Sequence, residues 1–184
     1  AEQLRLSVAK LLDTVSVGDE PPPKAIIVPH AGYAYSGPIA ASAYARVALG
    51  RSTYQTVVLL GPAHRKRIHG IVASSAAAFA TPLDTVPLDG HSIDLLLDEG
   101  LALIDDEAHA QEHCIEVQLP FLQVLLSDFE IVPLLVGKAD AEHVRKVLEL
   151  LWNGPETLLV ITSDLSHFHS YDVCREVDTT TAAA

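Results

Sequence analysis

Cysteine and tryptophan are scarce in this sequence of 184 residues, which has two cysteines, one tryptophan and no methionine. Two cysteines are too few for the disulfide framework that stabilises small secreted domains. No stretch of about 18 uncharged apolar residues occurs, so no membrane-spanning helix is predicted. Because the first residues also lack the basic and then apolar pattern of a secretion signal, we expect a cytoplasmic protein.

Basic residues are few as well, and this bears on the partners. Lys and Arg number 12 against 24 Asp and Glu, which gives a net charge of −12, and the densest basic cluster is Arg65-Lys66-Arg67. Such a surface repels a phosphate backbone, so we expect neither nucleic acid nor a membrane as a partner. Glycine-rich phosphate loops and the nucleophile elbow of hydrolases are also missing. Nucleotide-binding and hydrolase functions therefore lose their main support.

The sequence has enough apolar residues for a real core, because 49% of it is hydrophobic. No internal repeat or linker divides it, so we expect one domain over residues 1–184. Short apolar runs predict strands, and apolar residues at helical spacing predict helices between them. The expected strands are 25–28, 56–60, 70–73, 131–136 and 157–162, and the expected helices are 4–15, 38–49, 92–99, 112–126 and 141–152, with a kink at Pro120.

Most of the expected strands are apolar on both faces, and they alternate with helices. This pattern is typical of an α/β protein with helices on both sides of a sheet. We therefore predict a three-layer α/β/α sandwich with a mostly parallel or mixed central sheet.

Three of the expected strands run directly into polar side chains. His30 follows the first strand, His64 the second, and Asp164 and His167 the last. In open α/β sheets the ligand crevice lies outside the carboxyl ends of the strands, so these side chains could converge there. Two imidazoles and one carboxylate are typical of a non-haem Fe(II) site. A single histidine more often caps a helix or bonds a carbonyl, but three together favour a metal site.

An acidic run over residues 105–116 contains further candidates. We expect its first part, with Glu107 and His109, to be a solvated loop. Glu112 and His113 come directly before an apolar helical stripe, where the imidazole could point into the same crevice. Cys114 is more typical of a small core residue than of a metal ligand.

Five motifs stand in order along the chain, and together they carry a resemblance. They are V-P-H-A-G-Y at 28–33, L-G-P-A-H at 60–64, T-P-L at 81–83, E-H-C-I-E-V-Q-L-P-F at 112–121 and S-D-L-S-H at 163–167. From about residue 24 to residue 175 the chain closely resembles the Memo family. The fold of that family is similar to that of class III extradiol ring-cleaving dioxygenases, which hold a non-haem iron with two histidines and a carboxylate.

The resemblance implies roles for single residues. His30 and His64 correspond to metal ligands of the family, and Asp164 and His167 line the same pocket. By analogy with the dioxygenases, His167 would be the acid/base residue, and His113 a pocket residue that steadies a bound anion or oxygen species. The implied cofactor is Fe(II) or copper.

One departure from the family concerns the end of the sequence. Family members carry a further C-terminal segment with a cysteine that completes the metal site, whereas this sequence stops at Ala184. Cys174 does not match that cysteine, because it follows S-D-L-S-H by only a few residues in what should be the next helix. We therefore expect the third protein ligand to be missing from this chain and metal binding to be weak.

Three functions remain open on these grounds. The first is a metal-dependent oxidoreductase, related to the dioxygenases, that acts on a small molecule. The second is a binding module that uses the same pocket for a peptide or protein, since the eukaryotic Memo protein is an adaptor for phosphotyrosine peptides and microbial relatives are encoded beside radical-SAM and AMMECR-type proteins. The net charge of −12 makes a phosphopeptide less attractive here. The third is a structural relative that has lost the metal.

Overall fold

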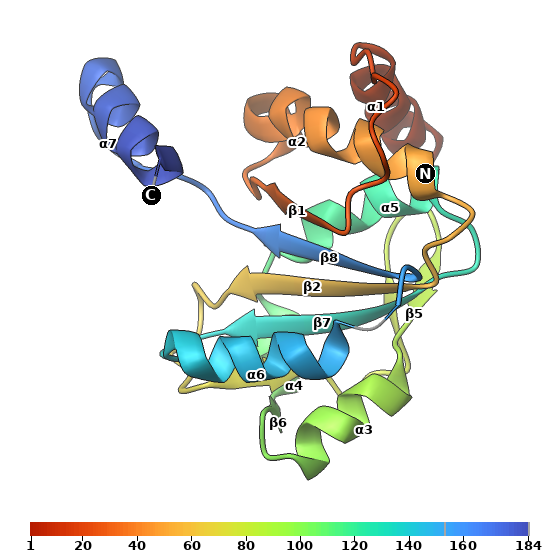
Figure 1. Ribbon diagram of the computed structural model, residues 1–184, viewed down its shortest axis with the longest axis vertical. Helices are drawn as coiled ribbons and strands as arrows, with labels where there is room; N and C mark the ends of the chain where they lie inside the picture. Colours follow the sequence, from red (N-terminus) through yellow and green to blue (C-terminus); the bar gives the residue numbers. More distant parts are fainter. Residues whose placement is uncertain (153, 184) are drawn as a thin grey trace.

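The computed structural model describes residues 1–152 and 154–183. Its centre is a six-stranded sheet with the order β1-β8-β2-β7-β3-β6 (Figure 1). The strands are β1 (Ala25–Val28), β2 (Thr56–Pro62), β3 (Ile71–Ala73), β6 (Leu103–Ile104), β7 (Glu130–Val136) and β8 (Thr157–Thr162). The expected strands are all present, with bounds that differ by at most two residues at an end.

Pairing within the sheet is mostly parallel. β1, β8, β2 and β7 pair in parallel, whereas β3 runs antiparallel to β7 and parallel to β6. The carboxyl ends of the first four strands therefore lie along one edge of the sheet. This edge carries the polar side chains that follow β1, β2 and β8.

Helices cover both faces of the sheet, so the predicted three-layer α/β/α architecture is confirmed (Figure 1). α1 (Glu2–Asp13), α2 (Tyr33–Val47) and α5 (Leu119–Leu125) lie on one side. α3 (Gly90–Asp98) and α6 (Ala141–Leu151) lie on the other. The remaining elements are η1 (Ala48–Gly50), α4 (Asp106–Ala110), η2 (Glu116–Gln118), the hairpin of β4 (Ala78–Ala80) and β5 (Thr85–Pro87), and α7 (Tyr171–Ala183).

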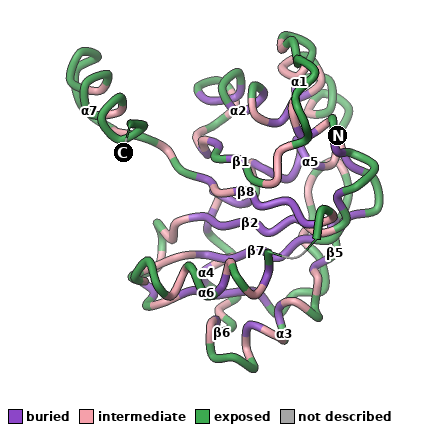
Figure 2. Tube along the Cα trace, viewed as in Figure 1, coloured by how far each residue is buried: buried purple, intermediate pink, exposed green. Residues whose placement is uncertain are grey.

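The core lies between the layers, and Figure 2 shows the central strands as its most buried part. Leu59, Val132 and Val160 in the middle of the sheet are fully buried. On the α2 side, the rings of Tyr44 and Phe121 stack with centroids 4.7 Å apart and an interplanar angle of 5°. This aromatic pair joins α2 to α5 directly beneath the candidate site.

The helix expected at 38–49 begins earlier, at Tyr33. The Ser36 amide donates to the Gly32 carbonyl at 3.1 Å, and its hydroxyl donates to the Ala31 carbonyl at 2.8 Å. A helical turn is therefore complete before Pro38, which lies inside the helix rather than in its first turn as expected.

The single helix expected over 112–126 was also wrong. Residues 112–115 form a turn, and the helical part is split into η2 and α5. Pro120 is the second residue of α5. The first turn of a helix needs no N–H donor for an intrahelical hydrogen bond, so Pro120 causes no kink inside the helix. The turn is held by long-range bonds of the Glu112 carboxylate, which no local pattern reveals.

The acidic run before this turn is not all loop, because residues Asp106–Ala110 form α4. The Asp105 side chain caps this helix by accepting from the Ala108 amide at 3.0 Å. His109, expected in solvent, donates through Nε2 to the Val72 carbonyl at 3.3 Å and packs against the Phe79 ring. The strands β4, β5 and β6 were not predicted, since they are only two or three residues long and mostly not buried, whereas the equally short β3 is buried throughout and lies in an apolar run.

Two elements of the described chain are poorly covered, because β1 is covered on one face only and α7 has no buried residue. β1 is an edge strand whose Ile27 side chain is 70% exposed, so it is apolar on both faces but covered on only one. α7 projects away from the sheet and has no buried residue (Figures 1 and 2). Within the described residues, none of the helices combines the length and apolar character that crossing a bilayer requires.

Candidate metal centre

Three imidazole rings meet at the carboxyl edge of the sheet. His30 comes from the end of β1, His64 from the end of β2, and His113 from the turn before η2. The ring centroids of His30 and His64 are 5.1 Å apart. The His113 centroid lies 6.1 Å from His30 and 5.8 Å from His64. The structure thus brings together three histidines that are spread over more than 80 residues of sequence.

His30 is held on both its backbone and its ring. Its amide donates to Oδ1 of Asp164 at 2.8 Å, and its Nδ1 lies 2.6 Å from the Thr162 hydroxyl. The residue is only 4% exposed. Burial lowers the pKa of the imidazole, and the neighbouring histidines act in the same direction while Asp164 opposes them. His30 therefore favours the neutral form, which is the form that binds metal ions.

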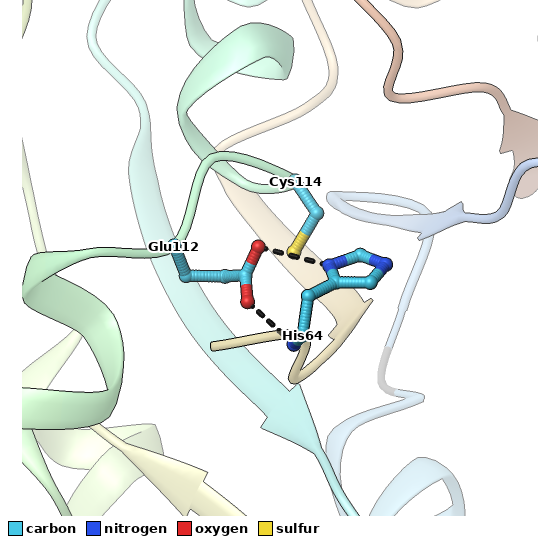
Figure 3. Close-up of side chains that lie close together, drawn as sticks. All are labelled: His64, Glu112 and Cys114. Carbon is cyan, nitrogen blue, oxygen red and sulfur yellow. Dashed lines mark hydrogen bonds and ion pairs between the residues drawn. The ribbon is translucent and has the colours of Figure 1, made fainter. Parts of the chain in front are cut away.

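His64 is held by one carboxylate in two ways. Its amide donates to Oε2 of Glu112 at 2.6 Å, and its Nδ1 lies 3.0 Å from Oε1 of the same side chain. The second ring nitrogen, Nε2, points away from Glu112 (Figure 3). The ring itself is 42% exposed, so this nitrogen lies on the open side of the cluster.

Glu112 is the carboxylate at the centre of these contacts, and its side chain is only 2% exposed. Burial alone would raise the pKa of its carboxyl group. The hydrogen bonds from the His64 amide, the His64 ring and the His113 amide outweigh this and bring the pKa down to about 2. Glu112 is therefore charged at neutral pH and fixes the orientation of His64.

Cys114 lies beside this pair. Among the described residues, His64, Glu112 and Cys114 each offer one ligand atom within 4.8 Å of the others, so this group could hold a metal ion (Figure 3). The Cys114 thiol donates to the Pro62 carbonyl at 3.3 Å. Burial raises the pKa of this thiol to about 12, so it is protonated at neutral pH.

Asp164 connects His30 to His167. Its Oδ2 lies 3.7 Å from Nε2 of His30 and 3.6 Å from Nε2 of His167. His167 is 58% exposed and lies in the segment between β8 and α7. All five residues singled out in the sequence, His30, His64, His113, Asp164 and His167, are therefore linked by contacts at one edge of the sheet. Their roles remain predictions.

A cavity of about 400 Å³ opens on the other side of Glu112. Its lining includes Phe79, Asp106, His109 and Glu116. A larger hollow of about 690 Å³ is lined by residues that include Thr56 and Glu130, at the amino ends of β2 and β7. That hollow lies at the opposite edge of the sheet from the histidines, whereas the smaller cavity shares Glu112 with the candidate centre.

Three contributors to the site escaped the sequence analysis or were given no role in it. Glu112 was noted beside His113, but its bonds to His64 join residues 48 positions apart. Thr162 was assigned only to a strand, although it is the last residue before the S-D-L-S-H motif. Gln118 is the one polar residue in the apolar stretch 117–122, which is the signal that sequence reasoning could have used, and in the structure it is only 1% exposed.

Comparisons with known proteins show the family of this chain. The family model described as "Memo-like protein" matches residues 1–182. A "MEMO1 family protein" of Aeropyrum pernix is 41% identical over 163 residues, which cover 84% of this chain and 57% of that protein. Another, from Aquifex aeolicus, is 38% identical over 177 residues, which cover 92% of this chain and 64% of that protein.

A third relative, "MEMO1 family protein MK0963" of Methanopyrus kandleri, is 35% identical over 160 residues, which cover 83% of this chain and 56% of that protein. The chain thus spans 56–64% of the length of these three relatives. The family model matches nearly the whole chain, and these three relatives each match 83–92% of it. The chain therefore belongs to the Memo-like family.

Proposed function

We propose that this chain carries the ligand cluster of a metal-dependent oxidoreductase, with His30 and His64 as metal ligands. The observation that carries the proposal is the pair of rings 5.1 Å apart, each with Nδ1 already engaged. Nδ1 of His30 contacts Thr162 and Nδ1 of His64 contacts Glu112, so Nε2 is the nitrogen that each ring has left for a ligand. Metal-binding histidines commonly use one nitrogen for the ion and the other for such a partner.

The spacing of the rings supports this pair. An imidazole bound at about 2.1 Å has its ring centre roughly 3.2 Å from the ion, so two such ligands at about 90–110° have centres roughly 4.5–5.2 Å apart. The 5.1 Å between His30 and His64 lies in this range. The 5.8 and 6.1 Å distances to His113 lie outside it, which favours His113 as a pocket residue beside the ion.

The donor set favours iron over copper. Copper would be favoured by a thiolate beside the imidazoles, and iron by a carboxylate. The Cys114 thiol is turned to the Pro62 carbonyl at 3.3 Å, whereas the Asp164 carboxylate lies 3.7 Å from His30 Nε2. When bound, the iron would supply the redox chemistry and an open coordination position for a small-molecule substrate.

The protein's own residues would orient the ligands, contact the substrate and transfer protons. Asp164 accepts from the His30 backbone amide, and its Oδ2 lies 3.6 Å from Nε2 of His167, so a carboxylate lies beside the His167 ring. The exposed ring of His167 can exchange a proton with solvent or substrate, which suits an acid/base residue. His113, 45% exposed, is available to contact an anionic group of the substrate.

Metal analysis of a double variant and a control variant tests the proposal. The chain is equilibrated with Fe(II) by anaerobic dialysis, and its iron content is compared with that of His30→Ala/His64→Ala and of His91→Ala, whose imidazole is exposed in α3 and far from the cluster in sequence. We expect iron in the parent and the control and at least a tenfold loss in the His30/His64 variant. Equal iron in all three proteins would overturn the proposal.

The second candidate is a module that binds a peptide in the cavity behind Glu112. The 400 Å³ cavity, with Phe79 in its lining, is the observation that favours it. Radical-SAM and AMMECR-type proteins are the proposed pathway partners in that case. Fluorescence anisotropy with a tyrosine-phosphorylated peptide and its unphosphorylated twin tests this function. Binding that is lost in Phe79→Ala supports it, and no binding of either peptide rules it out for such ligands.

A further inference from the structure

We infer that a buried chain of three side chains, Tyr44, Gln118 and Thr162, positions the His30 imidazole so that Nε2 faces the metal site. None of these residues carries a charge, and none belongs to the set that the sequence analysis assigned to the site. The inference rests on the proposed function, because it assigns these residues a purpose only if His30 is a ligand. Its test can fail while the proposed function stands.

The last link of the chain is the contact between Thr162 and His30. The Thr162 hydroxyl lies 2.6 Å from Nδ1 of His30, a short distance for a hydrogen bond. Both residues are buried, at 2% and 4% exposure. The His30 ring therefore cannot rotate without breaking a bond that no water is available to replace.

Gln118 holds the Thr162 hydroxyl in turn. Its amide nitrogen donates to the carbonyl of Pro29 at 3.1 Å and to Oγ1 of Thr162 at 3.2 Å, and it lies 3.4 Å from the carbonyl of Cys114. Backbone carbonyls can only accept, so the nitrogen and not the oxygen of the amide must face them. This fixes Thr162 as an acceptor for Gln118 and leaves one lone pair and one hydrogen for His30.

Tyr44 completes the chain at the far end of the Gln118 side chain. Its hydroxyl donates to Oε1 of Gln118 at 2.9 Å, and the ring is clamped by stacking on Phe121. Tyr44 is 0% and Gln118 is 1% exposed. The three side chains of Tyr44, Gln118 and Thr162 thus cross the apolar core between α2, η2 and β8, and the row ends at Nδ1 of His30.

The alternative is that these side chains only satisfy one another's hydrogen bonds, because a buried polar group is costly without a partner. An isosteric apolar substitution separates the two roles. Thr162→Val keeps the volume and removes the hydroxyl, whereas Thr162→Ser keeps the hydroxyl. Thr157→Val is the matched control, since Thr157 is also a buried threonine, at 5% exposure, but at the opposite end of β8. Tyr44→Phe removes only the distant hydroxyl and preserves the stacking.

The experiment measures Co(II) affinity by anaerobic spectroscopic titration of the 184-residue chain, with thermal unfolding of each metal-free variant beside it. We expect Thr162→Val to weaken Co(II) binding about 10–100-fold, the range usual for loss of a ligand's hydrogen-bond partner. Thr162→Ser and Thr157→Val should bind like the parent, and Tyr44→Phe should show a smaller loss than Thr162→Val. The affinity loss should exceed any that follows from a change in unfolding temperature.

Nitrogen-15 NMR of the histidine rings supplies a readout that needs no metal. A positioned His30 ring gives one tautomer in the parent, and Thr162→Val should give averaged ring shifts while Thr157→Val does not. Parent-like Co(II) affinity and ring shifts in Thr162→Val would overturn the inference. If His30→Ala/His64→Ala loses Co(II) in the same series, the proposed function survives that result. If the double variant binds Co(II) like the parent, the proposed function fails and this inference fails with it.

Discussion

At the scale of single residues, the site depends on a buried carboxylate rather than on the histidines alone. Glu112 accepts from the His64 amide and the His113 amide and contacts the His64 ring, so one side chain fixes two segments of the chain. The sequence could show that Glu112 precedes an apolar stripe, but not that its partner lies at residue 64. Likewise it predicted His30 and His64 as neighbours because parallel strands end at one edge, while the support from Thr162 and Gln118 depends on packing that has no sequence period.

Glu112 should make the free energy of unfolding depend on pH. Its pKa is about 2 in the folded protein against a reference of 4.5, so its stabilisation is complete above about pH 5 and is lost as the pH falls towards 2. Glu112→Gln should destabilise the metal-free chain by about 2–3 kcal/mol at pH 7 and remove that part of the acid dependence. Denaturant unfolding at several pH values measures this. Glu107→Gln, an exposed control, should change little, and parallel pH curves for Glu112→Gln and the parent would contradict the account.

At the scale of elements, the sequence predicted the strands that lie in apolar runs. It did not predict the short strands β4, β5 and β6, or the turn that is held by bonds to a distant part of the chain. β2, β7 and β8 are buried along most of their length, so their apolar runs stand out in the sequence. β4, β5 and β6 are short and mostly not buried, so they form no apolar run of the kind that reveals the equally short β3. The expected helix over 112–126 was wrong because Glu112 bonds to His64 instead of continuing a helical ladder.

β2 contains a glycine at a point of close approach. A Cβ on Gly61 would lie 2.5 Å from Sγ of Cys114 and 2.9 Å from Cγ2 of Thr162. Gly61→Ala should therefore destabilise the chain by about 1–3 kcal/mol. Cys114→Ala in the same chain removes the sulfur and should restore part of this loss, which a double-mutant cycle of unfolding free energies measures. Full additivity of the two substitutions would show that the close approach is not the cause.

α7 should contribute little to stability, because none of its residues is buried. We expect a chain that ends at Ser170 to unfold within about 1–2 °C of the parent. Val8→Ala in α1 is the contrasting change, because Val8 is 0% exposed and its truncation should cost about 1–3 kcal/mol. Thermal unfolding by circular dichroism compares the two. A large loss of stability without α7 would mean that this helix packs against the body of the protein.

At the scale of the whole molecule, a cluster of imidazoles lies in a protein with an excess of negative charge. The net charge is −12 with histidine neutral, so the folded chain repels itself. Composition alone gives this charge and makes nucleic acid an unexpected partner, but only the fold shows that three imidazoles are gathered at one place in an acidic protein.

Salt should stabilise the chain by screening this repulsion. Raising NaCl from about 0.01 to 0.15 M shortens the Debye length from about 30 to 8 Å, and we expect the unfolding temperature at pH 7.5 to rise by a few degrees. The same salt series at pH 5.0 is the control, since the isoelectric point is near 5.0 and the repulsion is small there. An equal response at both pH values would show that self-repulsion is not the origin of the effect.

The most direct measurement is anomalous diffraction at the iron edge from crystals of the chain loaded with Fe(II) under anaerobic conditions. The account predicts one peak at about 2.1 Å from Nε2 of both His30 and His64, with the Glu112 carboxylate still bonded to Nδ1 of His64. A peak between Glu112, Cys114 and Nδ1 of His64 would contradict it, because the ion would then occupy the group that the account assigns to orienting the ligand.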